Sequence, residues 1–438
     1  MIFRCRLRFF QRLLCLVIAL SGLLLLILYR YYELEALKSN EWLMKQLGIE
    51  EVVENKFDNN APVKETLDSP KVMYKKKTSH NNVVTSKGLS VDAAWQVWRS
   101  WPHTKQLYEE QYFSSNQMAD ILHHMATAPI INYDVGHRGT QLKALATLQG
   151  DQLAVFKPKR YERDYVVPGE PYAGFDMHTA EIVGFYLDGL LGFRLAPPVV
   201  GRVIDLTALK SVTSQKLLDT YFMQGDNMCF YGVCYYCKPA EAACADGTKM
   251  EGSLTLWLPV HMSLRNWRHP YQRTYRDGHS ARWEVNEDYC KNEVMLKVPY
   301  NNGPRLLDIM DTTVLDYLMG NADRHHYETF DADGNNGRLL HLDNGKSFRD
   351  PSKDESSILA PLRQCCRLRN STWRILQSLQ EDGLSGKLDK LLHNDPLYPI
   401  LTQAHLESLD RRHHTLLDVV NECIKQLGAP SVIINDIE

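Results

Sequence analysis

Three stretches of the chain repeat apolar residues at helical spacing, and each of the first two ends at a glycine. Their apolar positions are Ala180, Val183, Leu187 and Leu190 before Gly192; Leu307, Met310, Val314, Leu315 and Leu318 before Gly320; and Leu406, Leu409, Leu416, Val420 and Leu427 near the C-terminus. This pattern predicts three helices that each bury an apolar face in a core.

Short β-rich runs lie before and between these helices. Residues 152–159, QLAVFKPK, follow the run 142–148 and a Gly150-Asp151 turn, which predicts a hairpin that presents Lys157. Residues 338–342, RLLHL, predict a short strand that enters the turn 343–345. We therefore expect an α+β fold with two lobes, in which a β-rich small lobe runs to about residue 255 and a mostly helical large lobe follows.

Residues 13–29 form an uncharged apolar run that is long enough to cross a bilayer, which takes roughly 17 to 25 residues. Four arginines precede it, at positions 4, 6, 8 and 12, and this flank favours a cytosolic tail 1–12 with the rest of the protein in the lumen. The alternative is a cleaved signal peptide, whose apolar region is usually shorter and ends at small residues. Here four leucines at 23–26 follow Ser21-Gly22, so we interpret the run as a single-pass type II signal anchor.

The polarity of the chain changes again after the anchor. Residues 51–90 are rich in Asn, Lys, Glu and Ser, so we expect a flexible lumenal stem over 30–90. Trp95, Trp98 and Trp101 mark the return of buried structure, which places a folded domain at 91–438. The whole chain has a 44% hydrophobic content, which is enough for a core. The net charge of -3 argues against nucleic acid as a partner.

The cysteines agree with an oxidising compartment. Eight follow the anchor, an even number that suits four disulfides: Cys229, Cys234, Cys237, Cys244, Cys290, Cys365, Cys366 and Cys423. A zinc site on the first four is the alternative, but lumenal thiols are oxidised before they meet metal. Cys5 and Cys15 stand outside this set. Asn370-Ser371-Thr372 is a glycosylation sequon, although many sequons are never occupied.

Two aspartates in loops are the candidate catalytic residues. Asp323 follows the helix that ends at Gly320, and Asp343 follows the run 338–342. Phosphoryl transfer takes one carboxylate to orient the attacking hydroxyl and another to hold a divalent metal. The ordinary interpretation is that these are turn residues and that His325 and His326 are core imidazoles.

Lys157 and Glu181 are candidates for the nucleotide side of the site. A strand lysine followed by a helix glutamate is the pair with which kinases hold nucleotide phosphates. Each alone is weak, because a surface lysine or a solvated helix glutamate is commonplace. The chain lacks both common glycine-rich phosphate loops, and its nearest candidate is 135–140, VGHRGT.

The chain resembles the Golgi secretory-pathway kinases, the family that includes the Golgi casein kinase and Four-jointed. The resemblance runs from about residue 95 to 427 and rests on GNADRHHYE at 320–328, HLDNGKSF at 341–348, FKPKRY at 156–161 and the adjacent cysteines 365–366. Within this family, the chain is most similar to the branch that phosphorylates xylose. The stretches that carry this similarity are 166–181, 229–237, 243–259 and 303–328. This resemblance implies an atypical kinase-like fold and an ATP-dependent enzyme that phosphorylates the 2-hydroxyl of xylose in the linker between glycosaminoglycans and core proteins.

The resemblance also implies roles for individual residues. Asp323 is the catalytic base, Asp343 and Glu181 hold the metal, typically Mn²⁺ with Mg²⁺ as the alternative, and Lys157 binds phosphate. Other positions that match nucleotide contacts are Gln141, Glu328 and the hinge Leu256, Trp257, Leu258 and Pro259. The implied disulfides are Cys229–Cys244, Cys234–Cys237, Cys290–Cys365 and Cys366–Cys423.

Three functions follow as alternatives. The first is a Golgi xylose kinase, whose partners are the galactosyl-xylose linker and, through its anchor, the membrane. The second is a lumenal serine kinase for secreted proteins. The third is a non-catalytic activator of another kinase, which the intact set of Lys157, Glu181, Asp323 and Asp343 disfavours. The sequon at Asn370 makes the protein an expected glycoprotein.

Overall fold

The small lobe contains a five-stranded sheet, and buried and half-buried side chains alternate along its strands at 144–148 and 152–158. In this computed structural model, residues 88–436 are described except 102–105, 137–138, 260 and 277, with the backbone alone at 381–382. The expected tail 1–12, the anchor 13–29, nearly all of the stem 30–90, and Cys5 and Cys15 lie outside the described residues. Within the described ranges no helix has the length and hydrophobicity needed to span a bilayer.

The sheet has the order β1-β2-β3-β8-β4, and all its neighbours are antiparallel. Its strands are β1 (Ile130–Val135), β2 (Ala144–Leu148), β3 (Gln152–Pro158), β4 (Val199–Asp205) and β8 (Lys249–Leu256). The predicted hairpin is confirmed as β2 and β3, joined at Gly150 and Asp151, which both have positive φ. Phe156 is buried while its neighbour Lys157 is half-buried, because alternate strand residues face opposite sides. Lys157 therefore points away from the core that Phe156 joins.

A smaller three-stranded sheet follows β4 along the chain. It consists of β5 (Tyr221–Gln224), β6 (Asn227–Phe230) and β7 (Ala243–Cys244), after the short helix α6 (Gln215–Leu218). Cys229 and Cys244 pair across β6 and β7 and form a disulfide. A second disulfide joins Cys234 to Cys237 in the loop between these strands.

Helices precede the main sheet. They are α2 (Val91–Ser100), α3 (Glu110–Phe113) and α4 (Asn116–Thr127). Ser90 and Ser115 cap α2 and α4 with their side-chain oxygens, which satisfies amides that a helix start leaves unpaired. Trp95, Trp98 and Trp101 are all buried, so the predicted return of packed structure is confirmed.

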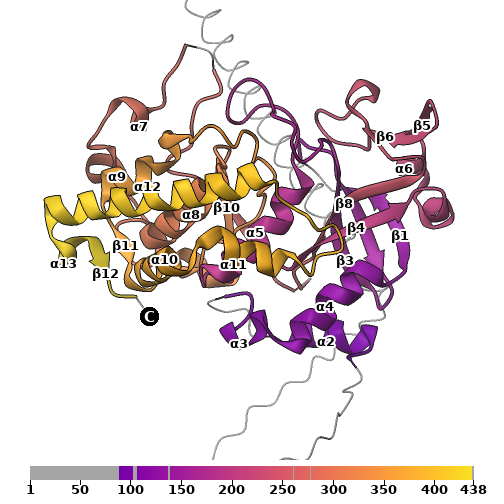
Figure 1. The fold of residues 1–438 in the computed structure, drawn as a ribbon, viewed down its shortest axis with the longest axis horizontal. Coiled ribbons are helices and arrows are strands. Elements are labelled where there is room, and N and C mark those ends of the chain that lie inside the picture. The colour runs from indigo at the N-terminus through magenta and orange to yellow at the C-terminus, as the bar shows by residue number, and fades with distance from the viewer. Residues whose placement is uncertain (1–87, 102–105, 137–138, 260, 277, 437–438) are drawn as a thin grey trace, which may run out of the picture. The chain divides into compact units, whose positions relative to one another are not determined.

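The large lobe is helical. Its helices are α7 (Arg282–Val285), α8 (Arg305–Met319), α9 (Ala360–Cys365), α10 (Asn370–Asp382), α11 (Leu384–Leu392), α12 (Gln403–Leu427) and α13 (Ala429–Val432). Two short strand pairs accompany them. One pair is β9 (Leu264–Arg268) with β10 (His326–Phe330), and the other is β11 (Leu368–Arg369) with β12 (Ile433–Ile434). Every residue of α8 is buried. Helix α5 (His178–Leu190) packs on β4 and β8 and also on α8 and α11, so it joins the two lobes (Figure 1). All three predicted helices are confirmed as α5, α8 and α12.

The strand predicted over residues 338–342 is wrong. Only Leu340 forms a bridge, to Glu328 on β10, whose ladder partner is β9. The reason is that Arg338 turns inward to Asp308 on α8, at 2.7 Å, and His341 donates its backbone amide to the carbonyl of Leu195. Side-chain and loop contacts take the place of a ladder here.

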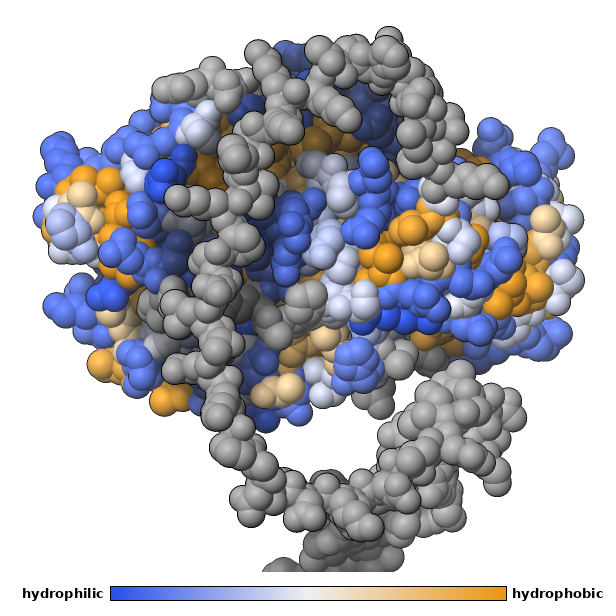
Figure 2. Space-filling model, turned by 90° about the horizontal axis from the view of Figure 1, so that it is seen from below, coloured by the Kyte–Doolittle hydropathy of each residue, from blue (hydrophilic) through white to orange (hydrophobic). Residues whose placement is uncertain are grey.

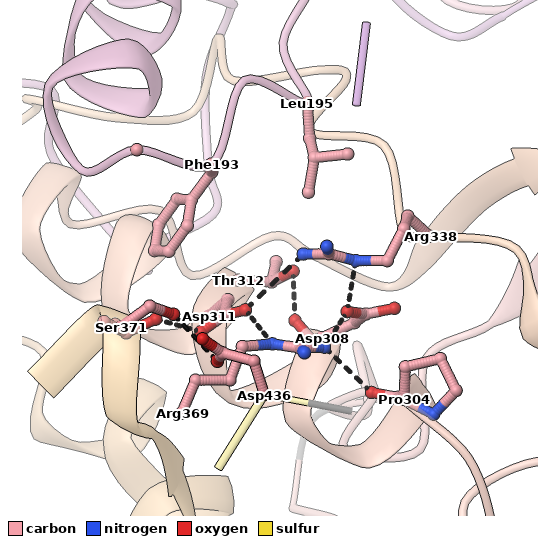
Figure 3. Close-up of polar contacts among 12 residues, drawn as sticks. Phe193, Leu195, Pro304, Asp308, Asp311, Thr312, Arg338, Arg369, Ser371 and Asp436 are labelled. Atoms are coloured by element: carbon pink, nitrogen blue, oxygen red, sulfur yellow. Dashed lines mark hydrogen bonds and ion pairs between the residues drawn. The ribbon is translucent and has the colours of Figure 1, made fainter. Parts of the chain in front are cut away.

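Arg338 belongs to a buried ion cluster that holds α8 (Figure 3). Arg369 donates to Asp311 at 2.6 Å and also to Asp308, and Thr372 donates to Asp311 at 2.7 Å. These partners come from three separate segments, so the cluster fixes the start of α10 and the chain before His341 against α8.

Two long-range disulfides close the large lobe. Cys290 pairs with Cys365 and Cys366 pairs with Cys423, so the adjacent cysteines have different partners. Cys366 ends α9 in a left-handed conformation, which directs its side chain toward α12. On the face drawn in Figure 2, hydrophilic residues predominate and hydrophobic residues lie in separate patches.

Candidate active site

Three carboxylates surround one lysine where the two lobes meet. The ammonium of Lys157 lies 3.0 Å from Asp176, 2.5 Å from Glu181 and 2.8 Å from Asp343. Asp176 and Glu181 are buried, whereas Asp343 is 74% exposed. Four residues that the sequence separates by up to 186 positions thus form one cluster.

Each member is held by a different element. Lys157 lies on β3, Glu181 in the first turn of α5, and Asp176 just before that helix. Asp343 has a left-handed conformation in a turn, which aspartate tolerates better than most residues. The backbone amide of Met177 donates to the carbonyl of Gly345 at 2.7 Å, and this bond joins the Asp176 segment to the Asp343 turn.

The charges of the cluster perturb one another. Burial alone would lower the pKa of Lys157, but the carboxylates of Asp176, Asp343 and Glu181 raise it well above its ordinary value. Lys157 in turn holds the pKa of Asp343 well below the usual range. Burial raises the pKa of Glu181, against the opposing effect of Lys157. Lys157 and Asp343 are therefore both ionised at neutral pH.

This donor set fits a divalent cation. One oxygen from each of Asp176, Glu181 and Asp343 lies within 4.8 Å of the others. Carboxylate oxygens are the ligands that Mg²⁺ and Mn²⁺ prefer. A side of Asp343 that is open to solvent leaves room for a further ligand such as a phosphate.

Asp323 lines the same cleft as Lys157. It follows α8, which ends at Gly320 with φ of 74°. Arg324 fixes this loop, because it donates to Asp316 at 2.7 Å, to the side chain of Asn344 at 2.9 Å and to the carbonyl of Leu342. The Asp323 loop and the Asp343 turn are therefore tied together by one guanidinium.

The carboxylate of Asp323 has a single hydroxyl donor among the described residues. The phenol of Tyr275 donates to its Oδ1 at 2.5 Å. Burial raises the pKa of Asp323, while this hydrogen bond and the nearby His325 lower it in part. The result is a carboxylate that ionises at a higher pH than an ordinary aspartate and can take up a proton more readily.

A pocket of about 510 Å³ extends from the cluster toward the link between the lobes. Its lining includes Lys157, Glu181, Glu328 and Asp343, together with the expected hinge residues Leu256, Trp257 and Leu258. Pro259 follows directly in the chain. Val155, Val199 and Met262 give the deep end an apolar surface, which suits a flat aromatic base.

The hinge backbone is only partly used by the protein. The Trp257 amide donates to Leu153 at 3.0 Å, and its carbonyl accepts from the indole of Trp98 at 3.1 Å. The amide and carbonyl of Leu258 have no hydrogen-bond partner in the described part of the chain. Leu258 is therefore the hinge residue that retains a donor and an acceptor for a ligand.

A second cavity, of about 250 Å³, joins the carboxylate cluster to Asp323. Lys157, Asp176, Asp323, Asp343 and Glu328 line it. Gln141 lines it too, from the loop between β1 and β2. All the expected catalytic, metal and nucleotide side chains thus border one continuous cleft, apart from Pro259.

Two functional candidates were missed from the sequence. Asp176 lies five residues before Glu181, and its only signal was its place inside the stretch 166–181. Arg324 follows Asp323 directly and was hidden among the charged residues of that loop. No sequence spacing identifies Asp176 or Arg324 as a site residue, because the side chains that they contact come from other elements.

The remaining expected sites lie elsewhere. The eight cysteines form the four disulfides that the resemblance implied. Asn370 is half-buried at the start of α10, away from the cleft. In its sequon the hydroxyl of Thr372 is buried and bonded to Asp311.

The chain is similar to known proteins over most of its length. Residues 93–432 match the family described as Golgi casein kinase, C-terminal, Fam20. Glycosaminoglycan xylosylkinase of Danio rerio is 51% identical over 348 residues, which are 79% of this chain and 84% of that protein.

Solved structures share the fold. The structure of hydra Fam20 with sugar has a TM-score of 0.75 and 46% identity, and the match covers 79% of this chain and 99% of that one. The Golgi casein kinase with Mn and ADP bound has a TM-score of 0.75 and 35% identity, with 79% and 85% covered. The expected mixed α/β, kinase-like fold is therefore confirmed.

Proposed function

Because the chain belongs to the Fam20 family of Golgi casein kinases and their relatives, we propose that it transfers the γ-phosphoryl group of ATP to the 2-hydroxyl of xylose in the glycosaminoglycan linkage region. The observation that carries the kinase chemistry is the convergence of Lys157, Asp176, Glu181 and Asp343 in one cluster, in a cleft that Asp323 also lines. The identity of 51% to a xylosylkinase supports the choice of acceptor.

The nucleotide is held along the cleft. The adenine lies in the apolar pocket against the hinge, where Leu258 supplies a backbone donor and acceptor. Lys157 binds the phosphates, with Gln141 and Glu328 at the border of the phosphate cavity. Asp176, Glu181 and Asp343 would hold Mn²⁺ or Mg²⁺, the ions that neutralise charge on the transferring phosphoryl group. A Golgi casein kinase with Mn and ADP bound supports this assignment.

Asp323 acts on the acceptor. Its carboxylate accepts a hydrogen bond from the sugar hydroxyl and orients the oxygen for in-line attack on the γ-phosphorus. As the new P–O bond forms and the bond to ADP breaks, the hydroxyl proton passes to Asp323. Arg324 keeps the loop in register with the Asp343 turn during transfer.

The alternative acceptor is a serine of a secreted protein. The same carboxylates and lysine would serve it, so the distinction depends on the acceptor side of the cleft. Identity is 51% to the xylosylkinase of Danio rerio and 43% to the human extracellular serine/threonine protein kinase FAM20C, which favours xylose.

The location is also part of the proposal. The apolar run 13–29 with its basic flank supports a single-pass anchor in the Golgi membrane, with a stem over 30–90 and the kinase domain 91–438 in the lumen. The four disulfides agree with an oxidising lumen, and glycosylation at Asn370 is expected there. Because Thr372 is buried in the folded domain, a glycan would be attached before folding is complete.

The test is phosphate transfer by the purified lumenal chain. ATP and Mn²⁺ are combined with a galactosyl-xylose glycoside in one reaction and with casein in another. We expect phosphate on the 2-hydroxyl of xylose, located by NMR, and little on casein. Transfer to casein alone would establish the serine kinase instead, and transfer to neither would refute both.

A further inference from the structure

A separate cavity of about 690 Å³ lies next to Asp323. It is bordered by β9, α7 and the chain between them, and it shares no lining residue with the nucleotide pocket. Tyr275 lines it and donates to Asp323. Arg273 lines it and donates to the carbonyl of Ala322 at 2.9 Å. The cavity therefore begins where the acceptor has to approach the base.

The lining of this cavity is strongly basic. Five cationic side chains border it, and no aspartate or glutamate of the described residues does. They are Arg268, Arg273, Arg276, Arg282 and Lys297. Such an arrangement attracts anions and repels cations.

Part of this positive charge is neutralised by Glu293, which does not line the cavity. Glu293 pairs with Arg282 and with Lys297. Arg268 and Arg273 hydrogen-bond to neutral groups instead, namely Gln272, Ser357 and the Ala322 carbonyl. Among the described side chains, no carboxylate lies within ion-pair distance of Arg268, Arg273 or Arg276. Arg268 and Arg273 are thus left for a ligand among the described residues, whereas Arg276 is followed in the chain by Asp277, which lies outside them.

The nucleotide of the proposed function does not supply that ligand, because its phosphates are assigned to Lys157, which lines a different cavity. The galactosyl-xylose unit is uncharged. The core peptide, however, is joined directly to the xylose, so its side chains lie within a few ångströms of the reacting sugar. We propose that this cavity binds aspartate and glutamate side chains of the core peptide next to the residue that carries the xylose, an inference that rests on the proposed function.

The test compares acceptors that differ only in charge. They are a galactosyl-xylosyl peptide with glutamates beside the sugar, the same glycopeptide with glutamines, and a galactosyl-xylose benzyl glycoside. We expect kcat/KM on the acidic glycopeptide to exceed that on the glutamine form by about ten-fold at low salt, and the preference to shrink at high salt.

The variants are Arg268→Gln and Arg276→Gln, whose side chains are exposed and lie outside the catalytic cluster. Each is expected to lower kcat/KM on the acidic glycopeptide by about three- to five-fold through KM. Activity on the benzyl glycoside is the internal reference for folding. Arg374→Gln, an exposed arginine on α10 remote from the cavity, is the matched control and should change none of the ratios.

Equal loss on all three acceptors, or no charge preference in the unaltered protein, would overturn the inference alone. A fourth acceptor, a linkage tetrasaccharide that ends in glucuronate on a neutral aglycone, separates the sugar carboxylate from the peptide. If the arginine variants lose activity on that acceptor and not on the acidic glycopeptide, the peptide assignment is wrong. Absence of transfer to any galactosyl-xylose acceptor would overturn the proposed function, and this inference with it.

Discussion

Asp323 and Asp343 have different partners, which separates their roles at the scale of single residues. Asp343 contacts Lys157 and belongs to the carboxylate cluster with Asp176 and Glu181, whereas Asp323 contacts Tyr275. Asp343→Ala should weaken Mn²⁺-dependent ATP binding and abolish turnover. Asp323→Ala should keep nucleotide affinity and lower the rate by about 10²- to 10⁴-fold. Calorimetric titration of Mn²⁺-ATP and a transfer assay measure the two effects, and equal loss of affinity in both variants would contradict the assignment.

Asp176 is expected to bind the metal together with Glu181 and Asp343. Asp176→Asn keeps the shape of the side chain but removes one negative charge from the cluster. The Mn²⁺ concentration at half-maximal activity should therefore rise by about ten-fold or more. Asp205→Asn is the control. Asp205 is the last residue of β4, and its described ion pair is with Lys249 on β8, outside the carboxylate cluster. An unchanged Mn²⁺ requirement in the Asp176 variant would exclude it as a ligand.

Burial raises the pKa of Asp323, the proposed base, and Tyr275 opposes that rise. The base has to be ionised, and the Tyr275 hydrogen bond stabilises its ionised form and so lowers its pKa. Tyr275→Phe removes that donor, so the pKa of Asp323 rises and the acid side of the kcat profile moves to higher pH. Tyr172→Phe is the control, because Tyr172 touches the Tyr275 ring edge without a bond to Asp323. A profile that does not move would show that another group controls the acid side.

At the scale of elements, the Cys366–Cys423 disulfide ties the end of α9 to α12. It closes a loop of 57 residues, whereas Cys234–Cys237 spans 3. Because the entropy removed from the unfolded chain grows with the loop, replacing Cys366 and Cys423 by Ser should cost about 2–4 kcal/mol. The corresponding change at Cys234 and Cys237 should cost clearly less. Denaturant unfolding measures both, and a larger loss from the short loop would contradict this.

For the whole molecule, the buried ion cluster of Figure 3 connects α8 to two distant segments. Arg369→Met leaves Asp308 and Asp311 buried with less positive charge, so the free energy of unfolding should fall by about 3–5 kcal/mol. Arg411→Met, at the partly exposed pair with Asp354, should cost about 1 kcal/mol or less. A similar loss of unfolding free energy in the two variants would mean that burial of the Arg369 cluster adds nothing to its effect on stability.

The sequence alone determined the local elements. Apolar spacing located α5, α8 and α12, the Gly150-Asp151 turn located the hairpin, and the resemblance named Lys157, Glu181, Asp323 and Asp343. These features are encoded by neighbouring residues, because helical and strand periodicity are properties of short segments.

The tertiary structure decided which distant residues meet. Asp176 lies in the carboxylate cluster, and Arg324 joins the two aspartate loops, through contacts that no local pattern encodes. The same cause made the strand prediction at 338–342 wrong, because Arg338 pairs with Asp308 on α8 and the His341 amide bonds to the Leu195 carbonyl in place of a strand ladder. The basic cavity beside Asp323 likewise arises only when β9 and the chain up to α8 fold next to the base, since pairing and burial of charge depend on partners far apart in sequence.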